Sequence, residues 1–279
     1  MLSYPDIDPV AFSLGPFSVH WYGLMYLLGF LIAWRLALRR SMRPWSPVRR
    51  IQVEDLIVYC AFGVILGGRF GYVIFYNFEK WLSDPIWLIR IWEGGMSFHG
   101  GLLGVLAALW LYGRKIKQPF LTLGDFVAPM VPIGIGLGRL GNFIGQELWG
   151  RPTDSWLGML FPGDSQQLPR HPSQLYEAIL EGLVLSIVLI IFSRKPRPKG
   201  VVGGLFLALY ASFRFSVEFL REPDSHIGFD LFDWMTRGQL LCLPMFAVGA
   251  GLILWGYFGP KAGAGTITST DSPINRDVE

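Results

Sequence analysis

The chain has 279 residues, of which 52% are hydrophobic and 16% are charged, and its mean hydropathy is +0.40. An ordinary soluble domain of this length is less apolar, and its apolar residues are less clumped, so that class is excluded. The formal net charge of +3 is small and does not indicate nucleic-acid binding.

Seven segments are apolar over about the 20 residues that a helix needs to cross the hydrocarbon core of a membrane. Alternating barrel strands would not produce such continuous apolar runs, so strands are not expected. The segments are 18–38, 54–76, 96–113, 122–142, 174–193, 202–219 and 238–258. The sequence therefore predicts an all-α integral membrane protein with seven transmembrane helices.

The basic residues predict the orientation of these helices. They cluster after the first, third and fifth segments, and such loops belong on the cytoplasmic side. The clusters are Arg39, Arg40, Arg43, Arg49 and Arg50; Arg114, Lys115 and Lys117; Arg194, Lys195, Arg197 and Lys199. The N-terminus is then periplasmic and the C-terminus cytoplasmic. Residues 1–15 hold no Lys or Arg, so we expect no signal peptide and a retained first helix.

Residues 1–258 are predicted to form a single polytopic domain with periplasmic loop elements at about 77–95, 147–173 and 221–237. The 147–173 segment is rich in proline and is expected to be an ordered loop, long enough to cover a site. The tail 259–279 is polar and built of small residues, which predicts a disordered cytoplasmic tail. No repeat with a period of 20–50 residues is visible, which weighs against an inverted-repeat transporter.

Cysteine and histidine give no metal-ligand pattern. Cys60 and Cys242 lie inside apolar segments, with spacing for neither a disulfide framework nor a zinc site. We interpret them as small buried apolar residues. His20, His171 and His226 show no metal-ligand spacing either. We therefore predict no metal.

A glycine-rich stretch in the fourth segment carries charge. Gly136-Leu-Gly-Arg-Leu-Gly141 matches a dinucleotide fingerprint formally, but no strand–turn–helix context accompanies it, and that interpretation is rejected. Close helix packing explains the glycines at Gly134 and Gly138, as it does the Gly63, Gly67 and Gly71 series. Packing does not explain Arg139 and Asn142, which share a helix face, or Glu147 just beyond them.

A second polar stripe lies on the sixth segment. Its members recur at helical spacing on one face: Tyr210, Arg214, Glu218 and Arg221. Glu218 and Arg221 are equally well interpreted as an internal ion pair that tolerates burial. Arg139, Arg214 and Arg69 lie deep in apolar segments, where an arginine is costly. A guanidinium binds phosphate oxygens bidentately, so we favour an anion site for Arg139 and Arg214.

His99 stands in Gly94-Gly-Met-Ser-Phe-His-Gly-Gly-Leu-Leu-Gly104. A lone histidine in a helix is more often a hydrogen-bonded structural residue. Here Gly100 and Gly101 allow a substrate or a backbone to approach closely, and histidine titrates near neutral pH. His99 is thus a candidate general base.

Five blocks resemble, in order, those of the bacterial prolipoprotein diacylglyceryl transferases. The run Gly138-Arg-Leu-Gly-Asn-Phe-Ile-Gly-Gln-Glu-Leu-Trp-Gly150 is similar to that family's G-R-x-G-N-F signature followed by E and G. The others are His20-Trp-Tyr-Gly-Leu-Met25, His99-Gly-Gly-Leu-Leu-Gly104, Arg170-His-Pro-Ser-Gln-Leu-Tyr-Glu177 and Arg214-Phe-Ser-Val-Glu-Phe-Leu-Arg-Glu-Pro-Asp224. One departure is Gln146, where many members carry Asn before the Glu. The resemblance covers about residues 4 to 258.

The resemblance implies a membrane enzyme of the bacterial inner membrane. It would move the diacylglyceryl group of phosphatidylglycerol to the lipobox cysteine of a preprolipoprotein signal peptide, amid membrane lipids and without a cofactor. His99, Arg139 and Arg214 are the implied catalytic residues; whether His99 removes the proton or only orients lipid stays open. The implied substrate-binding residues are Tyr22, Gly100, Gly101, Asn142, Glu147, Gly150, Tyr210, Glu218 and Arg221.

The arginines are expected to stabilise negative charge on the departing phosphate, with Asn142 and Tyr210 as hydrogen-bonding supports. Glu147 and Glu218 are expected to hold the arginines, and the 147–173 and 77–95 segments to cap the site. Two other classes remain open: a secondary transporter for an organic anion, and a structural membrane scaffold. Substrate-stimulated flux would indicate the first. For a scaffold, Arg139→Ala and His99→Ala would reduce stability and leave no specific activity to lose.

Overall fold

The computed structural model describes residues 2–5, 7–15, 17–222 and 234–259. These residues divide into two compact units, each described here by itself. Unit 1 comprises residues 2–36 and 127–259, and unit 2 comprises residues 37–126. The predicted tail from residue 260 and residues 223–233 of the predicted 221–237 loop lie outside the described residues.

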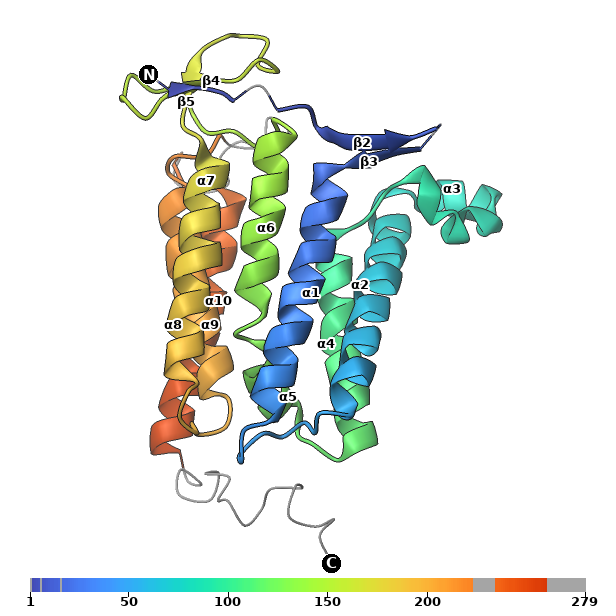
Figure 1. Ribbon diagram of the computed structural model, residues 1–279, viewed down its shortest axis with the longest axis vertical. Coiled ribbons are helices and arrows are strands. Elements are labelled where there is room, and N and C mark those ends of the chain that lie inside the picture. Colours follow the sequence, from blue (N-terminus) through green and yellow to red (C-terminus); the bar gives the residue numbers. More distant parts are fainter. Residues whose placement is uncertain (1, 6, 16, 223–233, 260–279) are drawn as a thin grey trace, which may run out of the picture. The chain divides into compact units, whose positions relative to one another are not determined.

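Each of the seven predicted apolar segments is largely helical (Figure 1). The helices are α1 (Trp21–Ser41), α2 (Gln52–Tyr76), α4 (Phe98–Ile116), α5 (Phe120–Val127) followed by α6 (Val131–Ile144), α7 (Ser173–Glu177) continuing through the π-helical η3 (Ala178–Val184) into α8 (Leu185–Phe192), α9 (Val201–Val217) and α10 (Arg237–Phe258). Shorter helices α3 (Phe78–Ser83), η1 (Pro85–Ile89) and η2 (Ile91–Glu93) occupy the predicted 77–95 loop element.

Four of these helices are long and apolar enough to cross a membrane: α1, α2, the continuous Ser173–Phe192 helix and α10. The α5–α6 pair qualifies as a fifth span, bent by 49° at its break. The break falls at Ala128–Met130, just before the helix that carries Arg139. The described residues thus form a helical membrane protein with four or five candidate spans, against the seven predicted from the sequence.

Short strands do occur, contrary to the sequence expectation. In unit 1, β2 (Val10–Leu14) and β3 (Phe17–His20) form an antiparallel hairpin, so the first helix begins at Trp21 rather than at residue 18. A second small sheet joins β1 (Leu2–Ser3), β4 (Met159–Leu160) and β5 (Pro169–Arg170). These strands lie outside the long apolar helices. The sequence argument concerned strands that cross a membrane as a barrel, and it says nothing about short strands in loops. The backbone N–H and C=O groups of these strands are paired with those of neighbouring strands.

Glycines allow two helices of unit 2, α2 and α4, to pack closely. The sequence analysis predicted close packing for the α2 glycines Gly63, Gly67 and Gly71. A Cβ built on Gly63 would lie 2.6 Å from the carbonyl oxygen of Gly104, and one on Gly71 would lie 2.7 Å from the Cα of Gly100. These distances are shorter than any real side chain tolerates, so α2 and α4 approach backbone to backbone. Close approach through small residues is the usual way in which helices associate in membranes.

In unit 1 a different glycine pair performs this task from the one predicted. A Cβ on Gly134 or Gly138 would meet no described atom within 4 Å, although one on Gly29 of α1 would lie 3.5 Å from the Cα of Gly134. The tightest approach is at Gly136, where a Cβ would lie 2.9 Å from the Cα of Gly182. Gly136 therefore lets α6 approach η3. This approach brings the face of α6 that carries Arg139 against the helix that carries Glu177.

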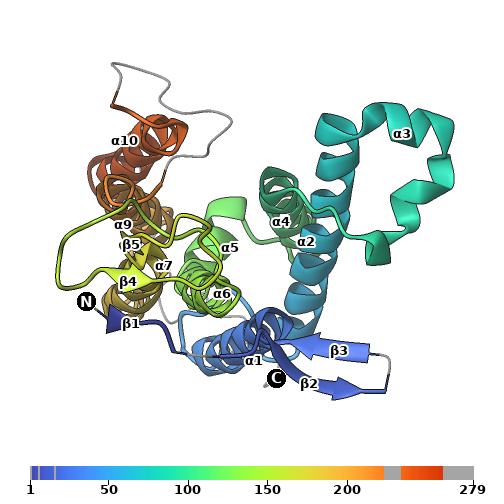
Figure 2. The same cartoon turned by 90° about the horizontal axis from the view of Figure 1, so that it is seen from above.

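The remaining helices of unit 1 pack as a bundle in which α7, α9 and α10 lie side by side (Figures 1 and 2). Leu185, Leu189 and Val202 are buried in its core cluster, with Tyr210 packed against it. A capping box at Thr236 and Gln239 begins α10, satisfying backbone N–H groups that would otherwise lack partners. This core positions α9, and with it Arg214.

Candidate functional site

The carboxylate of Glu177 contacts two arginines of unit 1, Arg139 and Arg214. Glu177, at the end of α7, is fully buried, and its Oε2 lies 3.1 Å from Nε of Arg139 on α6. Its Oε1 accepts a hydrogen bond from Nη1 of Arg214 on α9. One carboxylate thus spans the two arginines that the sequence analysis singled out. Glu177 itself ended one of the quoted motifs but was not predicted as a site residue.

Glu218 holds the other side of Arg214. Its Oε2 lies 2.7 Å from Nη2 of Arg214 and 3.9 Å from Nη1 of Arg221. Its Oε1 accepts a hydrogen bond of 2.8 Å from the hydroxyl of Thr236, the residue that caps α10. The polar stripe of the sixth segment is therefore an ion-pair network. Glu218 contacts Arg214 on α9 and Arg221 a few residues after it. The ion pair between Glu218 and Arg221 is therefore part of a larger network that includes Arg214.

Glu181 is a second carboxylate that the sequence analysis missed. It is fully buried on η3, one turn after Glu177, and its Oε1 lies 4.0 Å from Nη1 of Arg214. Neither of its oxygens has a hydrogen-bond partner among the described residues. The π-helical geometry of η3 is uncommon and often occurs at functional positions. The sequence signal that could have located it is the i, i+4 spacing of Glu177 and Glu181 within an apolar segment.

The charges of this cluster balance. Three arginines (Arg139, Arg214, Arg221) face three glutamates (Glu177, Glu181, Glu218), so the formal sum is zero with all groups ionised. Buried charges require this kind of pairing, because an unpaired charge in a low-dielectric interior costs several kcal/mol. An anionic ligand that binds these arginines would add negative charge to a cluster that is already neutral.

Asn142, Glu147 and Tyr22 form a neighbouring group in unit 1. The Asn142 side chain donates a 3.3 Å hydrogen bond to Glu147 Oε2, and the Glu147 backbone N–H donates to the Asn142 carbonyl at 2.9 Å. A Cβ on Gly141 would lie 2.8 Å from the ring of Tyr22, so the tyrosine packs directly on α6. Among the described residues, Glu147 pairs with Asn142 and lies within 4.0 Å of no arginine nitrogen, contrary to the expectation that it holds an arginine.

Gly150 joins the loop after α6 to the end of α9. Its N–H donates to the carbonyl of His171 at 2.8 Å, and it forms an antiparallel bridge with Arg221. A Cβ at this position would lie 2.7 Å from Cβ of His171 and closer still to the carbonyl oxygen of Leu220. The position accepts only glycine, because the two chain segments meet there backbone to backbone.

Buried polar contacts hold the 147–173 loop together. Arg170 donates to Asp164 at 2.6 Å and to Gln166 at 2.6 Å. The hydrogen bond from Arg170 is the main reason that the pKa of Asp164 lies below its ordinary value. Burial lowers the pKa of His171, whose Nδ1 lies 3.2 Å from the Tyr176 hydroxyl. Phe143, Met159 and Phe161 form an apolar cluster beneath this polar network.

The other predicted catalytic residue, His99, belongs to unit 2. It is exposed in the first turn of α4, where Ser97 caps the helix by accepting a hydrogen bond of 3.2 Å from the Gly100 N–H. Its ring lies edge-on to Phe98, with centroids 5.7 Å apart. The glycine at position 100 is required by packing, because a Cβ there would overlap the backbone of Gly67. Gly101 has more room, 3.6 Å from its nearest contact.

Arg69, also in unit 2, is committed to backbone carbonyls. Its guanidinium donates to the carbonyls of Trp87 at 2.6 Å and Leu88 at 2.9 Å, and further to Arg90, Gly94 and Gly95. The same group lies 4.5 Å from the ring centroid of Trp87. These contacts fix the η1–η2 segment to α2. No group of His, Cys, Asp and Glu suited to a metal occurs among the described residues.

Comparison with known proteins identifies the family. The family model for prolipoprotein diacylglyceryl transferase matches residues 9–255. A phosphatidylglycerol–prolipoprotein diacylglyceryl transferase of Teredinibacter turnerae is 59% identical over 270 residues, covering 93% of this chain and 94% of the relative. Enzymes of the same name from Oleidesulfovibrio alaskensis and Azotobacter vinelandii are 56% and 55% identical, each over 92% of this chain and over 95% and 97% of their own lengths. The chain therefore belongs to the prolipoprotein diacylglyceryl transferase family.

Proposed function

We propose that this protein transfers the diacylglyceryl group of phosphatidylglycerol to the cysteine thiol of a prolipoprotein. Family membership over residues 9–255 and the names of the relatives support this activity. The observation that carries the mechanism is the pair formed by the buried Arg214 and the partly buried Arg139, joined by Glu177. Nothing in these comparisons favours the transporter alternative.

The reaction is a displacement at carbon. The cysteine sulfur attacks the glycerol carbon that bears the phosphate ester, the sulfur–carbon bond forms and the carbon–oxygen bond breaks. The electron pair of the broken bond passes to the phosphate oxygen, so glycerol phosphate leaves and a thioether remains. The thiol loses its proton to a base. The phosphodiester supplies its own leaving group, which is why we propose no cofactor.

Arg139 and Arg214 are the proposed anion-binding pair. Charge builds on the phosphate as the bond breaks, and guanidinium groups in a water-poor interior stabilise it more strongly than they would in water. Glu177 keeps both guanidinium groups oriented before the lipid arrives, so that less reorganisation is needed in the transition state. The phosphate then takes over contacts that Glu177 makes in the resting protein. Asn142 and Tyr210 are proposed to donate hydrogen bonds to the lipid.

His99 is the proposed base, or the residue that orients the lipid, on the strength of its family motif and its chemistry. Tyr22, Gly100, Gly101, Glu147, Gly150, Glu218 and Arg221 are proposed to shape the lipid site. The 147–173 and 77–95 segments are proposed to cap it. Deleting the 147–173 loop without loss of transfer would remove that part of the proposal.

The finer topology is also a proposal. We propose seven transmembrane helices in the bacterial inner membrane, with the N-terminus periplasmic and the C-terminus cytoplasmic. The placement of the basic loops after the first, third and fifth segments supports this orientation. Single cysteines placed in each loop and labelled by an impermeant reagent in intact cells test it. Labelling of the 114–117 loop from outside would reverse the orientation.

The decisive experiment is transfer by the purified full-length chain in detergent. Phosphatidylglycerol and a lipobox peptide are supplied, and both the thioether product and glycerol phosphate are measured. Release of glycerol phosphate that requires the peptide cysteine, and is lost in folded Arg139→Ala, supports the reaction and the anion site. No release by folded wild-type protein would overturn the proposal.

A further inference from the structure

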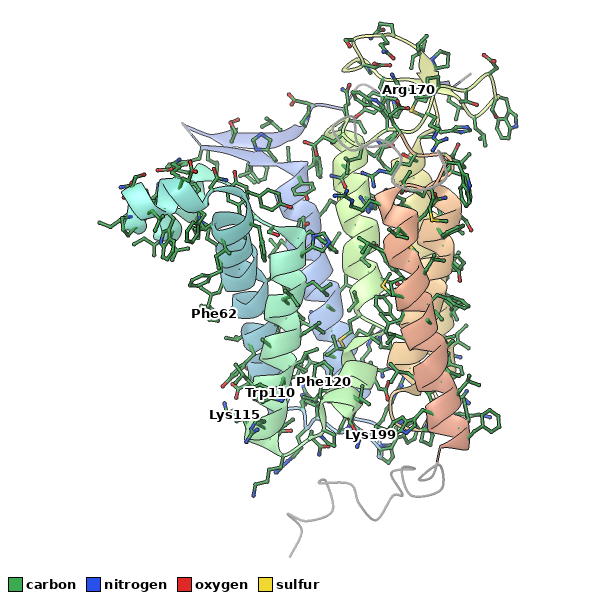
Figure 3. All side chains as sticks on the ribbon, turned by 180° about the vertical axis from the view of Figure 1, so that it is seen from behind. Phe62, Trp110, Lys115, Phe120, Arg170 and Lys199 are labelled. Atoms are coloured by element: carbon green, nitrogen blue, oxygen red, sulfur yellow. The ribbon has the colours of Figure 1, made fainter. Side chains whose placement is uncertain are left out.

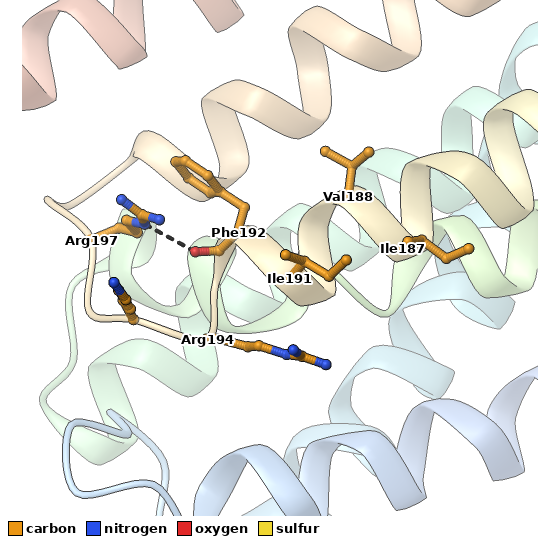
Figure 4. Close-up of a pocket in the computed structure, with 7 residues that line it drawn as sticks. Ile187, Val188, Ile191, Phe192, Arg194 and Arg197 are labelled. Atoms are coloured by element: carbon orange, nitrogen blue, oxygen red, sulfur yellow. Dashed lines mark hydrogen bonds between the residues drawn. The ribbon is translucent and has the colours of Figure 1, made fainter.

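A groove lies at the opposite end of the Ser173–Phe192 helix from Glu177. The cavity is about 560 Å³ (Figure 4). Four of its lining residues are apolar residues of α8, here called the apolar wall: Ile187, Val188, Ile191 and Phe192. The other three are basic residues of the turn that follows α8, here called the basic wall: Arg194, Lys195 and Arg197. The groove therefore joins an apolar helix face to a cluster of positive charges.

The apolar wall faces outward from unit 1. Ile187 and Ile191 are 48% and 54% exposed and lie one turn apart on the last part of α8. Exposed isoleucines on a membrane-crossing helix contact acyl chains, since only hydrocarbon offers them an apolar surrounding. This wall suits a lipid tail that runs along the helix.

The basic wall contains two cations with no acidic partner. Arg194 and Lys195 are exposed, and neither forms an ion pair with any described residue. The sequence holds no Asp or Glu between residues 182 and 217, so acidic side chains near in sequence are also absent. These two side chains are free to bind an anion from outside the chain.

Arg197, the third basic residue of the groove, contacts the last residue of α8. Its Nε donates a hydrogen bond of 2.9 Å to the Phe192 carbonyl, and its guanidinium lies 4.0 Å from the centroid of the Phe192 ring (Figure 4). This contact satisfies one of the carbonyls exposed at the end of α8, where the helix would otherwise present partial negative charge. The end of the helix is thereby less repulsive to an anion.

We propose that this groove binds an anionic phospholipid, with the phosphate between Arg194 and Lys195 and one acyl chain along Ile187 and Ile191. Basic pockets at the ends of membrane helices bind acidic lipid head groups in this way. Arg194 follows Glu177 by 17 residues (194 − 177), roughly 25 Å along a helix. Lys199 and Arg170, which mark the two ends of unit 1, lie far apart in Figure 3. The groove is thus separate from the arginine cluster.

Lipid binding to the full-length protein tests this site. The delipidated protein is titrated with phosphatidylglycerol in detergent, and bound copies are counted by native mass spectrometry. The double variant R194Q/K195Q is expected to bind one copy about thirtyfold more weakly, since each basic side chain near an anionic head group contributes about 1 kcal/mol. Phosphatidylethanolamine, which has no net charge, is expected to bind wild type and variant equally weakly.

The matched control is R114Q/K115Q, which removes the same charge from another helix end. Lys115 already pairs with Asp55 at 2.9 Å, and Arg114 lies over the Trp110 ring at 5.3 Å. The control should keep the copy that R194Q/K195Q loses. An equal loss in both variants, or none in either, would overturn the site. The R194Q/K195Q variant should also keep its transfer rate; a parallel loss of transfer would contradict a separate site.

Discussion

Glu177 Oε2 lies 3.1 Å from Arg139 Nε, and this ion pair ties α7 to α6. The other oxygen of the same carboxylate accepts a hydrogen bond from Arg214 on α9. The two arginines proposed to bind phosphate are therefore held by one buried acid. In the proposed reaction, phosphate would replace Glu177 as the anionic partner of these arginines, so that they would stay paired before and during transfer.

The first prediction concerns this acid. Glu177→Gln removes the charge that compensates the buried guanidinium of Arg214 and the partly buried one of Arg139. Breaking a buried pair in this way costs about 3–5 kcal/mol. We expect a lower midpoint of thermal unfolding in detergent and a loss of transfer. The control is Glu54→Gln at an exposed position on α2. A variant with an unchanged midpoint would show that Glu177 is not the partner of the arginines.

Glu181→Gln should behave in the opposite way. Glu181 is as buried as Glu177 but has no hydrogen-bond partner among the described residues. An amide of the same shape avoids the cost of burying a poorly paired charge, so we expect an unchanged or raised midpoint. The same thermal unfolding experiment checks it. Equal destabilisation by the two glutamine variants would mean that Glu181 carries a pairing role like that of Glu177.

Arg214→Lys tests the geometry of the anion site. Lysine keeps the charge but lacks the planar fork that contacts two oxygens at once. We expect transfer to fall about 100-fold, the usual effect of removing one transition-state donor. Arg35→Lys, an exposed position on α1, is the control. A rate within about twofold of wild type would indicate that charge alone suffices, contrary to bidentate phosphate binding.

His99→Gln separates proton removal from lipid orientation. If His99 is the base, transfer should fall by about 100-fold or more. Raising the pH toward the thiol pKa of about 8.5 should then restore part of the rate, because more of the peptide cysteine is already thiolate. Arg214→Lys should show no such recovery. A rate for His99→Gln that stays low at every pH would assign His99 to orienting the lipid.

The loop over residues 147–173 should depend on pH through Asp164. The pKa of this carboxyl is lowered in the folded protein, mainly by the hydrogen bond from Arg170. Its stabilising contribution is therefore complete above the unfolded pKa of about 3.9 and is lost as pH falls through the lower folded pKa. At pH 7, Asp164→Asn should increase hydrogen exchange in this loop. Exchange equal to wild type at pH 7 would contradict the role of the Arg170–Asp164 pair.

Most elements followed from local patterns. Long apolar runs predicted the helices, and glycines four residues apart predicted close packing of α2, which the structure shows to be against α4. The same spacing located the packing of α6 less well, since the tightest approach falls on Gly136 and not on Gly134 or Gly138. Glycines at this spacing show that one face of a helix lacks side chains. Which of these glycines contacts another helix depends on the position of that helix. Four of the five short strands were missed because they lie outside the apolar runs; β3 overlaps the first residues of the 18–38 run.

The sequence by itself determined the membrane class and the family, and it pointed to the arginines of the proposed anion site, because hydrophobicity and motif spacing are properties of the chain alone. Only the tertiary structure decided how those arginines are paired. Arg69 and Arg214 look alike in the sequence, yet Arg69 donates to backbone carbonyls and Arg214 pairs with the carboxylates of Glu177 and Glu218. Pairing depends on which helix faces meet, and this is settled by the packing of segments distant in sequence.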